Sequence, residues 1–332
     1  MRKSNLFRIG FALAPGFTLA TLAAAPTKAA APAGQPMYIA NNEIPGAGTV
    51  KEYSSTSGTT AGGFTTISSS DPTALAASSS DLYVGDSNTD TVKAYSPTTG
   101  AQISAVTFTT ITGVIPNALA VTSDGADLFV ASNAGTVKEY NASSGAEINT
   151  LSVSTSSPVV PLSLALTNNN ADIYIGSTNT TTFAGTVAEY AVATGAEVGS
   201  FPFSGFYPGG MLVSSDGTHL FVAEEDSNLV TEYNAATGAS VPFTLSPAPG
   251  EPVNLAGLGN NIFVADDGGI SGSGSQVEQY STTTGTPVSG FTDINGIDPT
   301  AIAIIAPEPS SAVLMLGLAL PLLLRRRLRA NH

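Results

Sequence analysis

The sequence has no cysteine and no tryptophan. It can therefore form neither a disulfide framework nor a thiolate site, and it lacks the largest aromatic stacking platform. Positive charge is scarce as well. Residues 43–308 hold all 25 acidic residues but only three basic ones, Lys51, Lys93 and Lys138, which gives this segment a formal charge of −22. Such a surface repels nucleic acid and anionic lipid, whereas neutral, cationic or polyhydroxyl ligands remain compatible with it.

A repeated unit dominates the rest of the chain. Residues 128–148, LFVASNAGTVKEYNASSGAEI, alternate apolar and polar residues as strands do, and contain a tyrosine followed five positions later by a turn glycine. The same Tyr-x4-Gly pattern occurs six times at intervals of 42 to 50 residues, at Tyr53, Tyr95, Tyr140, Tyr190, Tyr233 and Tyr280. Repeats of this length with four strands each indicate the blades of a β-propeller, and the periodic tyrosines are predicted to pack between blades.

The ends of the repeat region predict how the ring closes. Residues 37–40 match the second strand of a unit that has no first strand before it, and residues 300–305 match a first strand with no unit after it. Pairing the two segments completes six blades and protects their edges. We therefore predict an all-β fold over residues 34–306: a six-bladed propeller with four-stranded blades, closed by the C-terminal innermost strand. Prolines, which suit strand starts, precede the six first strands: Pro72, Pro116, Pro161, Pro208, Pro252 and Pro299.

The repeats resemble a known group of propellers. Residues 117–125, NALAVTSDG, followed by LFVA at 128–131, are similar to the NHL and YVTN repeats. This resemblance covers roughly residues 36–306 and implies the propeller fold. It implies little about activity, because propellers of this kind include lyases, lactonases, dehydrogenases and non-catalytic binding scaffolds.

The N-terminus is typical of a secretory signal peptide, which we assign to residues 1–33. Arg2, Lys3 and Arg8 supply the basic start, and residues 9–25 form an apolar run that ends in small residues. A membrane anchor is the alternative, but Pro15 and Gly16 interrupt the run. We expect this segment to direct export through the general secretion machinery.

The C-terminus, residues 307–332, has three parts in order. These are Pro307-Glu308-Pro309, an apolar segment over residues 312–324 that is short for a membrane-spanning helix, and a basic cluster containing Arg325, Arg326 and Arg327. This order resembles the PEP-CTERM sorting signal. The resemblance implies transient insertion of a hydrophobic transmembrane helix into the inner membrane and processing by an exosortase. It further implies placement on the surface of a Gram-negative bacterium or in its exopolysaccharide matrix. An ordinary tail anchor is the alternative.

Acidic and amide side chains are predicted to converge on one face of the ring, where the loops between second and third strands lie. Carboxylate and amide oxygens are the ligands that Ca²⁺ prefers. The candidate metal ligands are Asp86, Glu224, Asp226, Asp266 and Asp267. The alternative is a solvated acidic rim, and no Asp-x-Asp-x-Asp-Gly calcium loop occurs. Calcium is the only cofactor that the sequence suggests.

No catalytic residue can be assigned. His219 is the only histidine before the C-terminal segment, and it is expected in a surface hairpin on the face opposite the acidic rim. No serine has a matching histidine and acid for a triad, and the propeller segment has no arginine to bind phosphate. The favoured function is a non-enzymatic binding or scaffold protein of the surface or biofilm matrix. The alternative is a metal-dependent lactonase or hydrolase that uses the acidic mouth.

Overall fold

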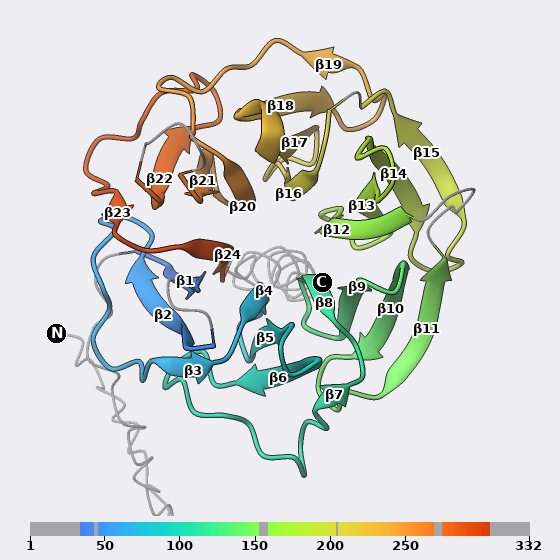
Figure 1. Ribbon diagram of the computed structural model, residues 1–332, viewed down its shortest axis with the longest axis vertical. Helices are drawn as coiled ribbons and strands as arrows, with labels where there is room; N and C mark the ends of the chain where they lie inside the picture. The colour runs from blue at the N-terminus through green and yellow to red at the C-terminus, as the bar shows by residue number, and fades with distance from the viewer. Residues whose placement is uncertain (1–33, 43–45, 153–158, 204, 269–273, 306–332) are drawn as a thin grey trace, which may run out of the picture. The chain divides into compact units, whose positions relative to one another are not determined.

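The computed structural model describes residues 34–42, 46–152, 159–203, 205–268 and 274–305, all within the unit Ala31–His332. They form six four-stranded antiparallel sheets arranged in a ring, as predicted (Figure 1). The predicted signal peptide, the sorting residues Pro307, Glu308, Pro309, Arg325, Arg326 and Arg327, and the C-terminal helix lie outside the described residues. No helix among the described residues has the length and apolar character needed to span a membrane.

Each blade runs from an innermost to an outermost strand. Blades 1 to 3 are β24(Pro299–Ile304)-β1(Pro36–Asn41)-β2(Gly48–Ser54)-β3(Ile67–Ser69), β4(Pro72–Ala77)-β5(Leu82–Asp86)-β6(Thr91–Tyr95)-β7(Ile111–Thr112), and β8(Pro116–Val121)-β9(Asp127–Ser132)-β10(Thr136–Asn141)-β11(Glu147–Ser152). Blades 4 to 6 are β12(Val159–Leu166)-β13(Asp172–Asn179)-β14(Gly185–Ala191)-β15(Glu197–Phe201), β16(Pro208–Val213)-β17(His219–Glu224)-β18(Leu229–Asn234)-β19(Ser240–Val241), and β20(Pro252–Leu258)-β21(Asn261–Asp266)-β22(Gln276–Ser281)-β23(Ile294–Asn295). A single 3₁₀ turn, η1(Glu225–Ser227), follows β17.

The ring closes as the sequence predicted. Strand β24, from the C-terminal end, pairs antiparallel with β1, and Met37 lies opposite Ile304. Blade 1 is therefore built from both ends of the propeller, so no innermost strand is missing from the ring (Figure 1). Loss of β24 would leave blade 1 open at the channel.

Aromatic side chains fill the space between blades. The six repeated tyrosines are all buried, which confirms the prediction that they belong to the core. A second set, not singled out in the sequence, occupies the second strand of every blade and is almost fully buried: Tyr38, Tyr83, Phe129, Tyr174, Phe221 and Phe263. Where this residue is tyrosine, its hydroxyl donates to a carbonyl of the next blade, as Tyr83 does to Ala142 at 2.9 Å. This arrangement joins neighbouring sheets by both packing and hydrogen bonds.

A β-bulge follows the repeat proline of each innermost strand, which is the first residue of five of these strands and the third residue of β12. The register with the second strand shifts by one residue directly after it, as between Pro116 and Ala118. Proline offers no N–H to the ladder. At the bulge, the residue after the proline has no partner on the second strand and is released from the ladder toward the channel opening. The six residues so released are Thr73, Asn117, Leu162, Gly209, Val253 and Thr300.

Candidate functional site

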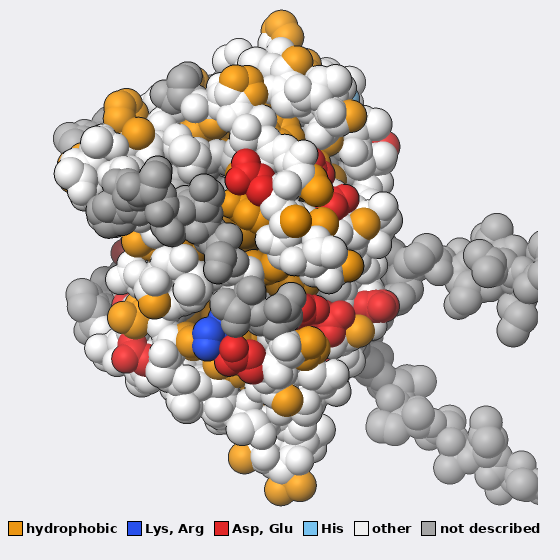
Figure 2. All heavy atoms as spheres, turned by 90° about the vertical axis from the view of Figure 1, so that its right-hand side faces the viewer, with side chains coloured by type: hydrophobic (Ala, Val, Ile, Leu, Met, Phe, Trp, Pro, Cys, Tyr) orange, Lys and Arg blue, Asp and Glu red, His pale blue; other side chains and the backbone are white. Residues whose placement is uncertain are grey.

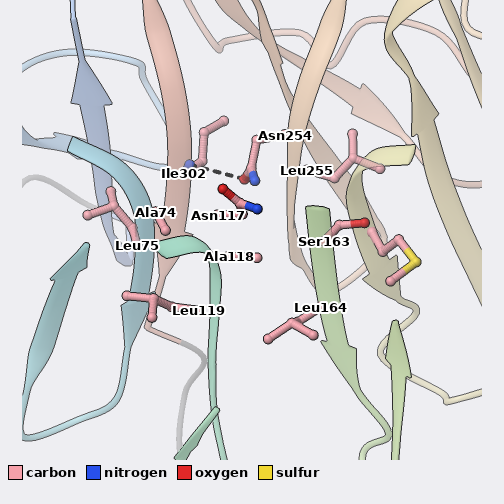
Figure 3. Close-up of a pocket in the computed structure, with 11 residues that line it drawn as sticks. Ala74, Leu75, Asn117, Ala118, Leu119, Ser163, Leu164, Asn254, Leu255 and Ile302 are labelled. Carbon is pink, nitrogen blue, oxygen red and sulfur yellow. Dashed lines mark hydrogen bonds between the residues drawn. The ribbon is translucent and has the colours of Figure 1, made fainter. Parts of the chain in front are cut away.

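The innermost strands surround a narrow axial channel. It has a volume of about 60 Å³ and is lined by leucine and alanine together with Asn117, Ser163 and Asn254. Figure 3 shows the Asn117 and Asn254 side chains toward the channel, with Leu119 and Leu164 farther along the strands. Since one water molecule needs about 10–15 Å³ by this kind of measure, the channel has room for a few waters and for no larger ligand.

The channel opens into a wider mouth at the end of the ring where the innermost strands begin. This mouth has a volume of about 240 Å³ and is lined by the residues released at the bulges, together with Glu225, Asp267 and Asp298. It is smaller than the roughly 300–1,000 Å³ of pockets for drug-sized ligands. The mouth could therefore hold a side chain or a small group.

A chain of hydrogen bonds fixes the walls of the mouth through blades 1 to 5. The Thr73 hydroxyl donates to the Pro116 carbonyl at 2.7 Å, and the Asn117 amide donates to the Pro161 carbonyl at 3.0 Å. Thr300 makes the same bond to Pro72, and Ser163 makes it to Pro208. The backbone carbonyls that face the opening are thus held by the preceding blade, so these walls are preorganised.

Blades 5 and 6 meet differently, because the bulge of blade 5 carries glycine. A Cβ at Gly210 would lie 2.6 Å from the Cα of Asn254, so only glycine lets the two backbones approach this closely. At neighbouring Gly209, a Cβ would occupy the space that the Glu225 carboxyl fills. The glycine pair therefore gives Glu225 its place at the wall of the mouth.

The rim of the mouth has two chemically different halves. We use the word rim for the residue before each repeat proline, which precedes a mouth-lining bulge residue by two positions: Asp71, Ile115, Val160, Tyr207, Glu251 and Asp298. Blades 3 to 5 contribute the apolar and aromatic members, and blades 6, 1 and 2 contribute the acidic ones. In five blades the carbonyl of this rim residue accepts a backbone N–H from the loop after the second strand, as between Asp267 and Glu251 at 3.1 Å.

Three of the five predicted metal ligands serve the scaffold. The Asp86 carboxylate accepts hydrogen bonds from Ser69, Ser70, Asn88 and Thr89. Burial raises the pKa of Asp86, but the bonds from Ser69, Ser70 and Thr89 outweigh this effect and hold the pKa well below its usual value. The fully buried Asp266 carboxylate accepts the backbone N–H groups of Glu251 and Gly268, each at 2.8 Å.

Glu224 plays a similar part in blade 5. Its carboxylate is buried and accepts the hydroxyls of Ser227 at 2.8 Å and Thr231 at 2.5 Å. Glu224, Asp86 and Asp266 end the second strands of three different blades. Asn41 and Ser132 hold the same place in blades 1 and 3, and their side chains also accept backbone N–H groups. This position is therefore a strand cap, and its carboxylates are occupied by intramolecular bonds.

The other two predicted ligands do come together. Asp226 and Asp267, from blades 5 and 6, lie close enough to Glu225 and Glu251 to perturb their ionisation. Burial, followed by the carboxylates of Glu251, Asp226 and Asp267, raises the pKa of Glu225 to about 7. Burial and the neighbouring Asp267 raise the pKa of Glu251 as well. Glu225 and Glu251, which are not among the five predicted metal ligands, thus interact electrostatically with Asp226 and Asp267.

Within the described residues, no group of three or more histidine, aspartate or glutamate side chains is arranged to hold a metal ion. Calcium binding stays a prediction. In blade 4, residues 177–179 belong to strand β13, which continues to Asn179. Ser177 and Thr178 pair with Thr186 and Gly185 of β14, and β12 and β13, with eight residues each, are the longest of the described strands.

His219 lies away from the mouth. It begins β17, whereas Glu224, beside the mouth, ends the same strand. Its Nδ1 atom faces the Glu232 carboxylate within ion-pair distance. His219 therefore lies at the end of β17 that is farther from the mouth.

The sequence has one partial match among known families. Residues 88–176 match the family described as outer membrane protein assembly factor BamB. The matched stretch is well under half of the chain and runs from the β5–β6 loop of blade 2 into β13 of blade 4. It is a similarity of propeller repeats. No curated protein matches the chain.

Proposed function

We propose that this protein is an exported, non-enzymatic binding propeller, displayed on the cell surface or in the exopolysaccharide matrix after exosortase processing of its C-terminus. Its binding surface is the mouth of the central channel. The observation that carries the binding role is the contrast between two kinds of acidic residue. Those at the strand ends are occupied by scaffold hydrogen bonds, as in Asp86 and Asp266, whereas Glu225 and Asp267 line an open cavity.

Two further observations support this role. A preorganised cavity with carboxylates but no neighbouring histidine suits recognition better than general acid–base catalysis, for which histidine is the commonest group. The partial similarity to a family named for outer-membrane assembly is compatible with a non-catalytic propeller outside the cytoplasm. The order of Pro307, Glu308 and Pro309, the apolar segment and the arginines supports the processing step.

The test of this proposal is the fate of both ends of the chain. Mass spectrometry of surface-released protein is expected to find no peptide from residues 1–25 or 312–324. Replacing Pro307 and Pro309 with alanine should leave export intact and trap an uncleaved form in the inner membrane. Recovery of residues 312–324 from released wild-type protein would overturn the exosortase assignment.

A further inference from the structure

The apolar half of the rim includes an aromatic pair in which Phe183 is exposed and Tyr207 is half-buried. The rings of Phe183 and Tyr207 lie 5.8 Å apart at 31°, and Phe183 is 50% exposed. An isolated bridge between Ala184 and Phe206 and a hydrogen bond from Gly185 N to Gly205 O hold these two segments together. Exposed aromatic side chains that a scaffold holds in place are typical of a binding surface.

This aromatic pair adjoins the carboxylates of the mouth. The backbone N–H of Glu225 donates to the carbonyl of Tyr207 at 3.4 Å, so the acidic turn lies directly beside the aromatic rim. Leu162, Gly209 and Val253 line the mouth together with Glu225 and Asp267, and Tyr207 precedes Gly209 by two residues. One side of the opening thus offers aliphatic and aromatic contacts, and the adjoining side offers negative charge.

The negative charge is not balanced nearby. Residues 159–295, which form blades 4 to 6, contain 13 acidic residues and no lysine or arginine. The three lysines of the propeller lie in blades 1, 2 and 3, in β2, β6 and β10. Figure 2 shows one side of the ring, on which acidic side chains occur in several places and a basic side chain in one place. Clefts lined by one sign of charge concentrate ligands of the opposite sign.

We propose that the mouth of the channel, on the side formed by blades 5 and 6, binds a lysine side chain presented by a partner protein. A lysine has an apolar four-carbon stem and a compact ammonium head. The stem would lie against Leu162 and Val253, with Tyr207 at the rim, and the ammonium would lie between Glu225 and Asp267. The inference rests on the proposed binding role and names the partner chemistry of the same mouth.

The two halves of the rim favour this occupant over others. A neutral sugar would use the aromatic pair but would leave the coupled carboxylates without a counter-charge. A small metal ion would use the carboxylates but would leave the aromatic and aliphatic wall without a partner. An ammonium on an apolar stem matches both halves, and charge complementarity of this kind confers specificity.

The probe for this site is tetralysine, with its fully Nε-acetylated form as the matched ligand that keeps the stem and removes the charge. Binding to the intact protein is measured by isothermal titration at ~0.15 M ionic strength, where the Debye length is about 8 Å and distant charges are screened. We expect tetralysine to bind and the acetylated peptide not to bind. The double variant E225Q/D267N should weaken binding by about tenfold or more, and Y207A should weaken it by a smaller factor.

The matched control is D172N/D216N, which removes the same charge from blades 4 and 5 far from the mouth. Asp172 begins β13, and Asp216 lies in the hairpin that precedes His219. This control should bind tetralysine as the wild type does. An equal loss in the control, or no binding by the wild type, would overturn the lysine site. Neither result touches the processing test, so failure of the site and failure of the proposed function remain distinguishable.

Discussion

At the scale of single residues, Glu225 has a carboxyl group whose ionisation is opposed by burial and by neighbouring carboxylates. It is half-buried beside Gly209, and its nearest charges are the carboxylates of Glu251, Asp226 and Asp267. Its pKa is therefore raised to about 7, from the ordinary value of 4.5. Strongly perturbed groups in a cleft are concentrated at functional sites, and here the perturbation marks a place where a cation would relieve repulsion.

A stability prediction follows from the sign of this shift. A carboxyl whose pKa is higher in the folded state binds protons more tightly there, so stability falls as pH rises between about 4.5 and about 7. Replacing Glu225 with glutamine removes the charge. We expect E225Q to raise the unfolding free energy by roughly 1–3 kcal/mol at pH 8 and to have little effect at pH 4. Urea unfolding at both pH values measures this, and equal effects at both would contradict the electrostatic explanation.

At the residue scale, the sequence did not predict which groups the acidic side chains contact. The acidic character of Asp86, Glu224 and Asp266 was visible, but their hydrogen-bond partners were not, because Ser69 and Gly250 approach them only in the folded blade. One signal was present in the sequence. The position three residues after each second-strand aromatic is always polar, whether aspartate, glutamate, asparagine or serine, and this variety indicates a capping role rather than a shared ligand set.

At the scale of elements, the turn between third and fourth strands serves two purposes. The sequence predicted a turn glycine five positions after each repeated tyrosine, and Gly100 has a φ of +72°, which favours glycine. The structure adds that a Cβ there would overlap the Thr65 carbonyl oxygen of the preceding blade. The same turn receives a hydrogen bond from Thr65 N to Thr99 O at 2.9 Å. These turns therefore help to join the outer strands of adjacent blades.

Three glycine-to-alanine substitutions separate these two effects. Gly62 has open space around it and no positive φ, Gly46 has open space and a φ of +81°, and Gly100 has both constraints. We expect almost no loss of unfolding free energy for G62A, about 1 kcal/mol for G46A, and at least about 2 kcal/mol for G100A. Thermal and urea unfolding check the order. A loss in G100A no larger than that in G46A would mean that the inter-blade contact is unimportant.

At the starts of the innermost strands, the sequence predicted the prolines but not the bulges that follow them. Five of the six prolines begin an innermost strand, as expected for a residue that has no N–H to pair, whereas β12 begins two residues before Pro161. The bulge after each one was not predicted, because it depends on the register with the second strand. That bulge turns Thr73, Asn117 and their counterparts toward the opening. The lining of the candidate site therefore required the structure.

At the scale of the whole molecule, closure and charge follow from the order of the repeats. Blade number and closure were predictable because the unmatched first and last segments had to pair, and β24 with β1 confirms this. The uneven charge is also present in the sequence, since all three propeller lysines fall in the first three blades. What the sequence did not reveal is that the acidic blades 5 and 6 approach closely at Gly209 and Gly210, which leaves space for the Glu225 carboxyl at the wall of the mouth.

The most direct test of the account is removal and return of the closing strand. A chain ending at Asp298 lacks β24 and with it the mouth residues Pro299 and Thr300. We expect it to lose the single cooperative unfolding transition of the closed ring. A peptide of residues 299–305 should restore this transition as its concentration rises, by binding the folded form. Calorimetric melting that is unchanged by the truncation, or unaffected by saturating peptide, would contradict closure of the propeller by its C-terminal strand.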